Sequence, residues 1–322
     1  MFPEELASLE VELSAGLVSV EEMLRQEIAS DYELADITAR HLVEAGGKRF
    51  RPLLVLLAAQ FGDPAAPGVI PSAVVVELTH LATLYHDDVM DEAAVRRGAE
   101  SANSRWGNTV AILSGDFLFA RSSKILADLG PEAVRVQAQT FERLVVGQLR
   151  ESVGPQSGED PVSHHLEVLA DKTGSLIAAA GRYGAMMSGV DATTTDAIAE
   201  FGECIGVVFQ LSDDLLDIES EVSGKTPGTD LREGIKTLPV LLALQDPITT
   251  EQLRDLLSRP LPDDQEHELA LTLLRAHPAM DAARAVLQEW ADRARTLLAK
   301  LPDNQAKLAL HVLIDSVTNR DI

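Results

Sequence analysis

The chain has 322 residues and a formal net charge of −24, from 27 Lys and Arg against 51 Asp and Glu. A surface this acidic repels nucleic acid and anionic lipid at long range, so we expect no nucleic-acid partner and at most peripheral membrane contact. No uncharged apolar run approaches the ~20 residues that a membrane-spanning helix needs.

The composition favours an all-α fold. Hydrophobic residues make up 46% of the chain but aromatic residues only 4%, and helical periodicity recurs between short Gly and Pro breaks. We predict one large helical domain over residues 1–322. The lone Cys204 fits a reducing compartment, and the first residues lack the basic and apolar regions of a signal peptide, so we expect a cytoplasmic protein.

The first candidate site follows a glycine pair. Gly46-Gly47 ends one predicted helix, and Pro52 suits the first turn of the next. Backbone N–H groups at that helix start, with Lys48 and Arg51 beside them, make an anion site. The alternative is a helix-ending glycine pair followed by bases that face solvent.

A later predicted helix, mostly apolar from Ser72 to Tyr85, carries an aspartate cluster with DDxxD spacing, Asp87, Asp88 and Asp91. Residues four apart share a helix face, so these carboxylates project together, and His80 lies on the same stripe two turns earlier. Such a histidine could equally be a buried core residue. Arg96 and Arg97 follow the cluster, and guanidinium groups match phosphate oxygens in planar pairs.

A second DDxxD cluster, Asp213, Asp214 and Asp217, lies on a later predicted helix. Gln210 precedes it on the same face. Further polar residues lie at Lys172-Thr173, near the start of an apolar helix, and at Lys225, in a loop bounded by glycines. Together they would surround the acidic faces with cations, as expected if phosphates bridge the two charges.

The two clusters point to a divalent metal. A lone DDxxD in an acidic protein is usually a solvated helix face. Two copies on helices with apolar flanks are costly without a counter-ion, because buried like charges repel one another. Mg²⁺ prefers carboxylate oxygens and binds together with substrate phosphates. Two such faces turned towards each other would make a cage for a diphosphate.

These segments, in this order, resemble the all-trans isoprenyl diphosphate synthases, or polyprenyl synthetases. The resemblance rests on Gly46 to Pro52, His86 to Gly98, Gly115-Asp116, Lys172-Thr173, Phe209 to Asp217 and Gly224 to Pro239. It implies an isoprenoid synthase type I fold around a deep central pocket, usually as a homodimer.

The resemblance also implies a role for each residue of the candidate site. About three Mg²⁺ ions would be held, together with the substrate diphosphate, by Asp87, Asp88, Asp91, Asp213, Asp214 and Asp217. The allylic diphosphate would contact Arg96, Lys172, Thr173, Gln210 and Lys225. Isopentenyl diphosphate would contact Lys48, Arg51, His80 and Arg97.

The implied reaction is a head-to-tail (1′-4) condensation. Metal ions and guanidinium groups neutralise the departing pyrophosphate, which lets the allylic substrate ionise. The double bond of isopentenyl diphosphate attacks the cation, and a proton is then lost to the pyrophosphate. Water must stay out while the cation exists.

Two further features concern the length of the product and the match of one motif to the family. Bulky residues four or five positions before the first aspartate shorten the product in this family. Here Thr83 and Ala82 are small, which favours a product longer than C20, such as a quinone side-chain precursor, with Phe117 and Phe119 as other candidates for a pocket floor. The family often has Lys where Ile235 stands, with Lys236 one position displaced, so one diphosphate contact is in question.

Three alternatives remain. A farnesyl or geranylgeranyl diphosphate synthase would make a shorter product. A non-catalytic subunit of a heteromeric synthase would be expected to lose acidic ligands, whereas all six aspartates are present here. A terpene cyclase normally has a different second metal motif and needs no isopentenyl site.

Overall fold

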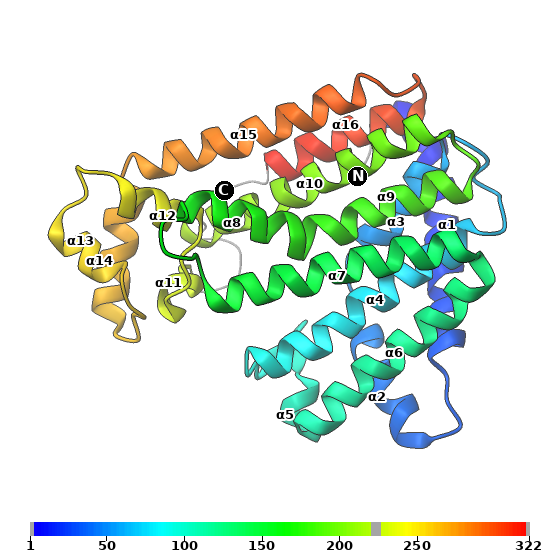
Figure 1. Cartoon of the computed structure of the whole chain (residues 1–322), viewed down its shortest axis with the longest axis horizontal. Coiled ribbons are helices and arrows are strands. Elements are labelled where there is room, and N and C mark those ends of the chain that lie inside the picture. The colour runs from blue at the N-terminus through cyan, green and yellow to red at the C-terminus, as the bar shows by residue number, and fades with distance from the viewer. Residues whose placement is uncertain (1–2, 220–226, 320–322) are drawn as a thin grey trace. The chain divides into compact units, whose positions relative to one another are not determined.

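The computed structural model describes residues 3–219 and 227–319, and most of them lie in helices (Figure 1). A 3-10 helix, Glu4–Leu6, opens the chain. The α-helices of the first half are α1 (Ala7–Ile28), α2 (Glu33–Glu44), α3 (Phe50–Ala59), α4 (Val69–Met90), α5 (Ala102–Trp106), α6 (Asn108–Leu129) and α7 (Pro131–Val153). Two short strands, β1 (Val95–Arg96) and β2 (Ala99–Glu100), follow α4.

The second half is helical as well. Its α-helices are α8 (Pro161–Leu169), α9 (Ser175–Met187), α10 (Ala192–Glu219), α11 (Thr229–Glu233), α12 (Leu238–Gln245), α13 (Glu251–Leu256), α14 (Asp264–Arg275), α15 (Ala279–Leu298) and α16 (Gln305–Thr318). A π-helical turn, Ala170–Gly174, joins α8 to α9. The all-α prediction is therefore confirmed, while the β1–β2 hairpin was not predicted.

The chain divides into two compact units. Unit 1 comprises residues 1–141, 176–199 and 300–310, and unit 2 comprises residues 142–175, 200–299 and 311–322. Several boundaries between the units fall inside helices. The single domain over 1–322 and the deep central pocket stay predictions.

Helix α4 is the central element of unit 1. It packs against α1, α3 and α6. Its buried residues lie on all sides, from Val69 at its start to Asp88 near its end. A helix that is apolar all round has to be enclosed by its neighbours. The first aspartate cluster therefore stands at the end of a helix that packing holds in place.

In unit 2, α12 packs against α8, α14 and α15. Its residues Leu238, Val240 and Leu241 are buried, and Pro239 occupies its first turn, where the missing N–H costs nothing. The part of α10 that lies in unit 2 carries the second aspartate cluster. Nowhere in the part of the chain that the structure describes is a helix long and apolar enough to cross a membrane.

Candidate active site

The first aspartate cluster spans the end of α4. Asp87 and Asp88 lie in its last turn, and Asp91 is the residue that ends it. The side chain of Asp88 is fully buried, and its Oδ1 accepts a 2.6 Å hydrogen bond from Nε of Arg96. Burial raises the pKa of Asp88, and Arg96 opposes that effect only in part.

The second oxygen of Asp88 is exceptional. Oδ2 is buried and has no hydrogen-bond partner. Leaving a buried acceptor unpaired costs ~1–3 kcal/mol, and more when the group is charged. A cation bound at Oδ2 would remove this cost, so the site fits a divalent metal ion.

The β1–β2 hairpin places the two arginines. Its strands pair Val95 with Glu100 and Arg96 with Ala99. The two turn residues, Arg97 and Gly98, have φ values of 53° and 77°, the left-handed conformation that a tight hairpin requires. Their side chains then diverge: Arg96 reaches Asp88, whereas Nη1 of Arg97 donates to the backbone oxygens of Leu42, at 3.0 Å, and Gly46.

A cationic cluster surrounds His80 in unit 1. Burial lowers the pKa of His80 well below its usual value, and the charges of Arg51, Arg97, Arg49 and Arg96 lower it further. Burial likewise lowers the pKa of Arg51 to about 10. Nε of Arg51 is buried without a hydrogen-bond partner. The cluster therefore has unmet capacity for an anion.

Arg49 belongs to this cluster but has its own counter-ions. It donates to Glu21, to Oε1 of Glu77 at 2.6 Å and to the backbone oxygen of Val43 at 3.1 Å. Its φ of 47° is left-handed, a cost that persists only where the surroundings enforce it. Sequence reasoning missed Arg49. Glu77, a carboxylate within an apolar helix, was the signal that a buried cation had to lie opposite.

Lys48 lies beside this cluster in the sequence but is exposed, unlike its neighbours Arg49 and Arg51. It belongs to the loop between α2 and α3, which begins after Glu44 and ends before Phe50. The structure thus brings Arg51, His80 and Arg97 together, with Arg96 nearby on Asp88, and places Lys48 at the surface.

The second aspartate cluster lies within α10, in unit 2. Asp214 is buried; its Oδ2 lies 3.0 Å from Nε2 of His165, and its Oδ1 accepts a 3.4 Å hydrogen bond from Gln210. Asp213 and Asp217 are half-buried. His165 was not predicted, because nothing in its spacing from Asp214 indicates the contact.

Asp217 holds the start of α11. Its Oδ1 and Oδ2 accept hydrogen bonds from the backbone N–H groups of Thr229 and Asp230, each at 3.1 Å. A carboxylate at this position satisfies N–H groups that a helix start leaves unpaired. Asp217 therefore has a structural role as well as its predicted one.

Among the described residues, protein side chains alone do not form a complete metal cage. Within residues 3–219 and 227–319, no three His, Cys, Asp or Glu side chains are grouped closely enough to hold a metal ion. Mg²⁺ commonly binds through one or two carboxylates and completes its shell with water and substrate phosphate. Separate carboxylates such as Asp88 suit that mode of binding.

Lys172 and Thr173 lie in the π-helical turn of unit 2. The ammonium group of Lys172 donates to the carboxylate of Glu151 on α7. Lys225 lies outside the described residues. Ile235 and Lys236 are both exposed, in the loop between α11 and α12.

The residues predicted to set the chain length, Ala82 and Thr83, lie on α4 about one turn before the aspartates. Ala82 is fully buried, and Thr83 is 8% exposed, its hydroxyl donating to the backbone oxygen of His80 at 2.8 Å. Phe119 on α6 lies beside His86, with ring centroids 5.8 Å apart. Phe117 stacks instead under the guanidinium group of Arg121, with 4.8 Å between Cζ and the ring centroid.

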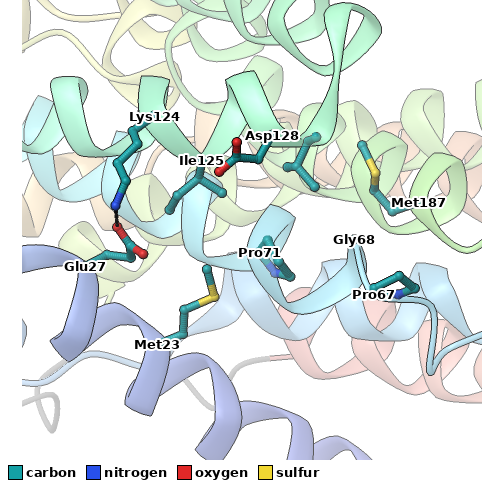
Figure 2. Close-up of a pocket in the computed structure, with 10 residues that line it drawn as sticks. Met23, Glu27, Pro67, Gly68, Pro71, Lys124, Ile125, Asp128 and Met187 are labelled. Carbon is teal, nitrogen blue, oxygen red and sulfur yellow. Dashed lines mark hydrogen bonds and ion pairs between the residues drawn. The ribbon is translucent and has the colours of Figure 1, made fainter.

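A cavity of about 380 Å³ lies in unit 1 at the other end of α4 (Figure 2). Met23, Pro71, Ile125 and Met187 line it, and an ion pair of 3.3 Å joins Lys124 to Glu27 at its edge. At ~1.5 Å per residue, Pro71 is roughly 24 Å along the helix from Asp87. This cavity is thus separate from the aspartate cluster.

The chain matches one protein family over most of its length. The model of the family described as polyprenyl synthetase matches residues 33–274. The chain is 50% identical over 310 residues to a nonaprenyl diphosphate synthase of Mycobacterium tuberculosis, covering 95% of this chain and 92% of the relative. It is 42% identical over 302 residues to a dimethylallyltranstransferase of the same organism, covering 93% and 92%.

Solved structures of prenyl diphosphate synthases also resemble this chain. Geranylgeranyl pyrophosphate synthase from Corynebacterium glutamicum, complexed with calcium and isoprenyl diphosphate, superposes with a TM-score of 0.88 at 45% identity and 98% coverage of both chains. Decaprenyl diphosphate synthase from Rhodobacter capsulatus gives a TM-score of 0.88 at 33% identity, covering 97% of this chain and 98% of that one.

Proposed function

Because the chain belongs to the polyprenyl synthetase family of prenyltransferases, we propose that it condenses isopentenyl diphosphate head-to-tail with an allylic diphosphate. Two buried atoms of unit 1 carry the proposal. Oδ2 of Asp88 has no donor, and Nε of Arg51 has no acceptor. A metal-bound diphosphate would satisfy the first and a free diphosphate the second.

The proposed metal site takes about three Mg²⁺ ions, held by Asp87, Asp88, Asp91, Asp213, Asp214 and Asp217 together with substrate phosphate. The metal supplies positive charge that neutralises the pyrophosphate as it departs. Support comes from the fit of Oδ2 of Asp88 and from the calcium in the Corynebacterium glutamicum complex.

The isopentenyl diphosphate site is formed by Arg51, His80 and Arg97, with Lys48 at its exposed edge. The negative charges of Glu21 and Glu77 are matched by Arg25 and Arg49, so the charges of Arg51 and Arg97 remain for a ligand. Because His80 is held neutral, it can donate one hydrogen bond without adding charge. Binding here needs no metal.

The allylic diphosphate site is formed by Arg96, Lys172, Thr173, Gln210 and Lys225. In the structure Arg96 is paired with Asp88, Lys172 with Glu151 and Gln210 with Asp214. Each of these polar groups is thus held by a protein partner that a phosphate could replace. The pairing limits the repulsion between cations before substrate binds.

The chain's residues promote ionisation by electrostatics. The guanidinium and ammonium groups of the allylic site stabilise negative charge on the leaving pyrophosphate, which leaves an allylic cation. The terminal carbon of isopentenyl diphosphate attacks that cation, and the pyrophosphate takes the proton that is lost. The apolar, buried wall of α4 below Asp87 excludes water from the cation.

The product is proposed to be longer than C20, of the kind used as a quinone side chain. Ala82 and Thr83 are small, buried residues before the first aspartates, and Thr79, one turn further, is also small and buried. The 50% identity to a nonaprenyl diphosphate synthase supports this length. The similarity to a geranylgeranyl pyrophosphate synthase, 45% identical, keeps a C20 product as the second candidate.

We also propose that the enzyme is a homodimer of the cytoplasm. Ile112 and Leu113 on α6 are 42% and 60% exposed, and adjacent large apolar side chains at a surface favour a protein contact. Both substrates are water-soluble diphosphates.

The separate sites can be tested by thermal unfolding. Isopentenyl diphosphate should raise the Tm with or without Mg²⁺, and the effect should be lost in Arg51→Leu. A non-hydrolysable farnesyl diphosphate analogue should raise it only with Mg²⁺, and Asp88→Asn should abolish that rise. A ligand at 100 times its Kd stabilises by ~2.7 kcal/mol, which such a scan resolves. No stabilisation by either ligand would contradict the proposal.

A further inference from the structure

The turn that carries Lys172 and Thr173 has an unusual backbone. Residues Ala170–Gly174 form a π-helical turn between α8 and α9, with the hydrogen bonds of α-helix on either side. A π turn is wider than an α turn, so it is rare and requires support from its neighbours. That support is found on one face of α7, within unit 2.

Asp171 fixes the turn by its side chain. Its Oδ1 accepts a 2.9 Å hydrogen bond from Nε of Arg143, and its Oδ2 accepts one of 3.3 Å from Nη1 of Arg150. The guanidinium group of Arg143 is itself held, because Nη1 donates to Glu203 on α10 at 2.6 Å. Arg143, a residue of α7, thus contacts both the π turn and α10.

Gly147 fixes the turn by close approach. A Cβ atom there would lie 2.7 Å from the backbone nitrogen of Lys172 and 2.9 Å from Cβ of Asp171. Gly147 lies four residues after Arg143 and three before Arg150, so all three share one face of α7. This face of α7 therefore contacts the turn through the guanidinium groups of Arg143 and Arg150, and Gly147 between them leaves room for the backbone of the turn.

The side chain of Lys172 is held more loosely than its backbone. Its ammonium group pairs with Glu151, whose side chain is 46% exposed. A half-exposed ion pair contributes little and exchanges readily, so a phosphate can replace Glu151. The backbone stays in place while the ammonium group changes partner.

We infer that Arg143, through Asp171, is a positioning residue that holds the π turn so that Lys172 and Thr173 meet the allylic diphosphate. Arg143 itself touches no substrate. The inference rests on the proposed function, because it takes from it the role of Lys172 and Thr173. Gly147 serves the same purpose by letting α7 approach the turn.

The test compares steady-state kinetics of Arg143→Leu, Arg143→Lys and Gly147→Ala, with farnesyl diphosphate and isopentenyl diphosphate varied separately in the presence of Mg²⁺. Arg143→Leu and Gly147→Ala should each lower kcat/KM for farnesyl diphosphate roughly 10- to 100-fold, since a small displacement of a positioning group has effects of this order. The KM for isopentenyl diphosphate should stay unchanged. Arg143→Lys should recover part of the loss.

Arg135→Leu is the matched control. Arg135 lies on the same helix and pairs with Glu132 at 3.1 Å, but both side chains are more than 60% exposed. Its replacement should leave both kinetic constants and the Tm unchanged.

A double-mutant cycle separates this inference from the proposed function. Once Lys172→Ala and Thr173→Ala have removed the groups that the turn presents, adding Arg143→Leu should cost little more. If Lys172→Ala leaves the KM for farnesyl diphosphate unchanged, the proposed role of Lys172 is wrong. If Lys172→Ala weakens that substrate but Arg143→Leu and Gly147→Ala do not, the positioning role is wrong. Equal loss for both substrates, together with a lower Tm, would also overturn it, because that result describes a purely structural residue.

Discussion

Arg96 donates a 2.6 Å hydrogen bond from Nε to Oδ1 of Asp88, whose other oxygen is buried without a partner. The pair joins strand β1 of the β1–β2 hairpin to the end of α4. A buried carboxylate with one satisfied oxygen is a cost to the folded chain. The protein keeps this cost where the proposed chemistry needs a metal ligand.

Asp88→Asn should separate activity from stability. The amide can still accept the bond from Arg96 but removes the buried charge, so we expect the ligand-free Tm to equal or exceed that of the wild type. We expect kcat to fall about 10²- to 10³-fold, as for other single electrostatic contacts to a transition state. Calorimetry and product assay measure the two effects, with Asp196→Asn, the exposed partner of Arg182, as the control. A lower Tm with full activity would contradict the assignment.

His80 should make the free energy of unfolding decrease as the pH falls. Burial and four arginines lower the pKa of His80 in the folded chain below its usual 6.5. Its contribution to stability is therefore complete above about pH 6.5 and is lost as the pH falls, because the unfolded chain binds the proton more readily. Urea unfolding of His80→Gln should show a smaller decrease in the free energy of unfolding between about pH 6.5 and 5 than the wild type. Parallel decreases in the two proteins would show that His80 is not responsible.

Asp217 should show two separable roles. Asp217→Ala removes the acceptor of two backbone N–H groups at the start of α11, which typically costs ~0.5–2 kcal/mol. Asp217→Asn keeps an acceptor but loses the charge that a metal ion needs. We expect Asp217→Ala to lower both the Tm and kcat, and Asp217→Asn to lower mainly kcat. Full activity in Asp217→Asn would leave Asp217 with its structural role alone.

Ala82→Phe should shorten the product. Ala82 is fully buried one turn before the aspartates, so a phenyl ring there either fills the product pocket or overpacks the helix. Overpacking costs ~1–3 kcal/mol, so the Tm must be measured together with the product length. Ala82→Leu should give an intermediate length. Products of unchanged length from a stable Ala82→Phe protein would place the floor of the pocket on another helix.

The sequence was most informative where a pattern follows helix geometry. DDxxD on an apolar helix predicted the helices that carry Asp87 and Asp213, and the family model confirmed the resemblance that these motifs suggested. Spacing along one helix says nothing of partners from elsewhere in the chain. Arg49 with Glu77 and His165 with Asp214 were therefore missed, since each pair joins distant segments.

Backbone irregularities were missed for a similar reason. Ala170–Gly174 has no residue that rules out an α-helix, and its π turn contacts Arg143 and Gly147 of α7, which are distant in the sequence. The β1–β2 hairpin has strands of two residues and an Arg-Gly turn rather than the Asn-Gly pair that marks such turns. Both features position residues of the proposed site.

The proposed synthase activity can be measured in an assay with labelled isopentenyl diphosphate, farnesyl diphosphate and Mg²⁺, with products separated by length. We expect label in a ladder of products that extends beyond C20, and none when Mg²⁺ is removed by chelation. A ladder ending at C20 would contradict the product length alone. No incorporation with farnesyl, geranyl or dimethylallyl diphosphate would contradict the proposed synthase.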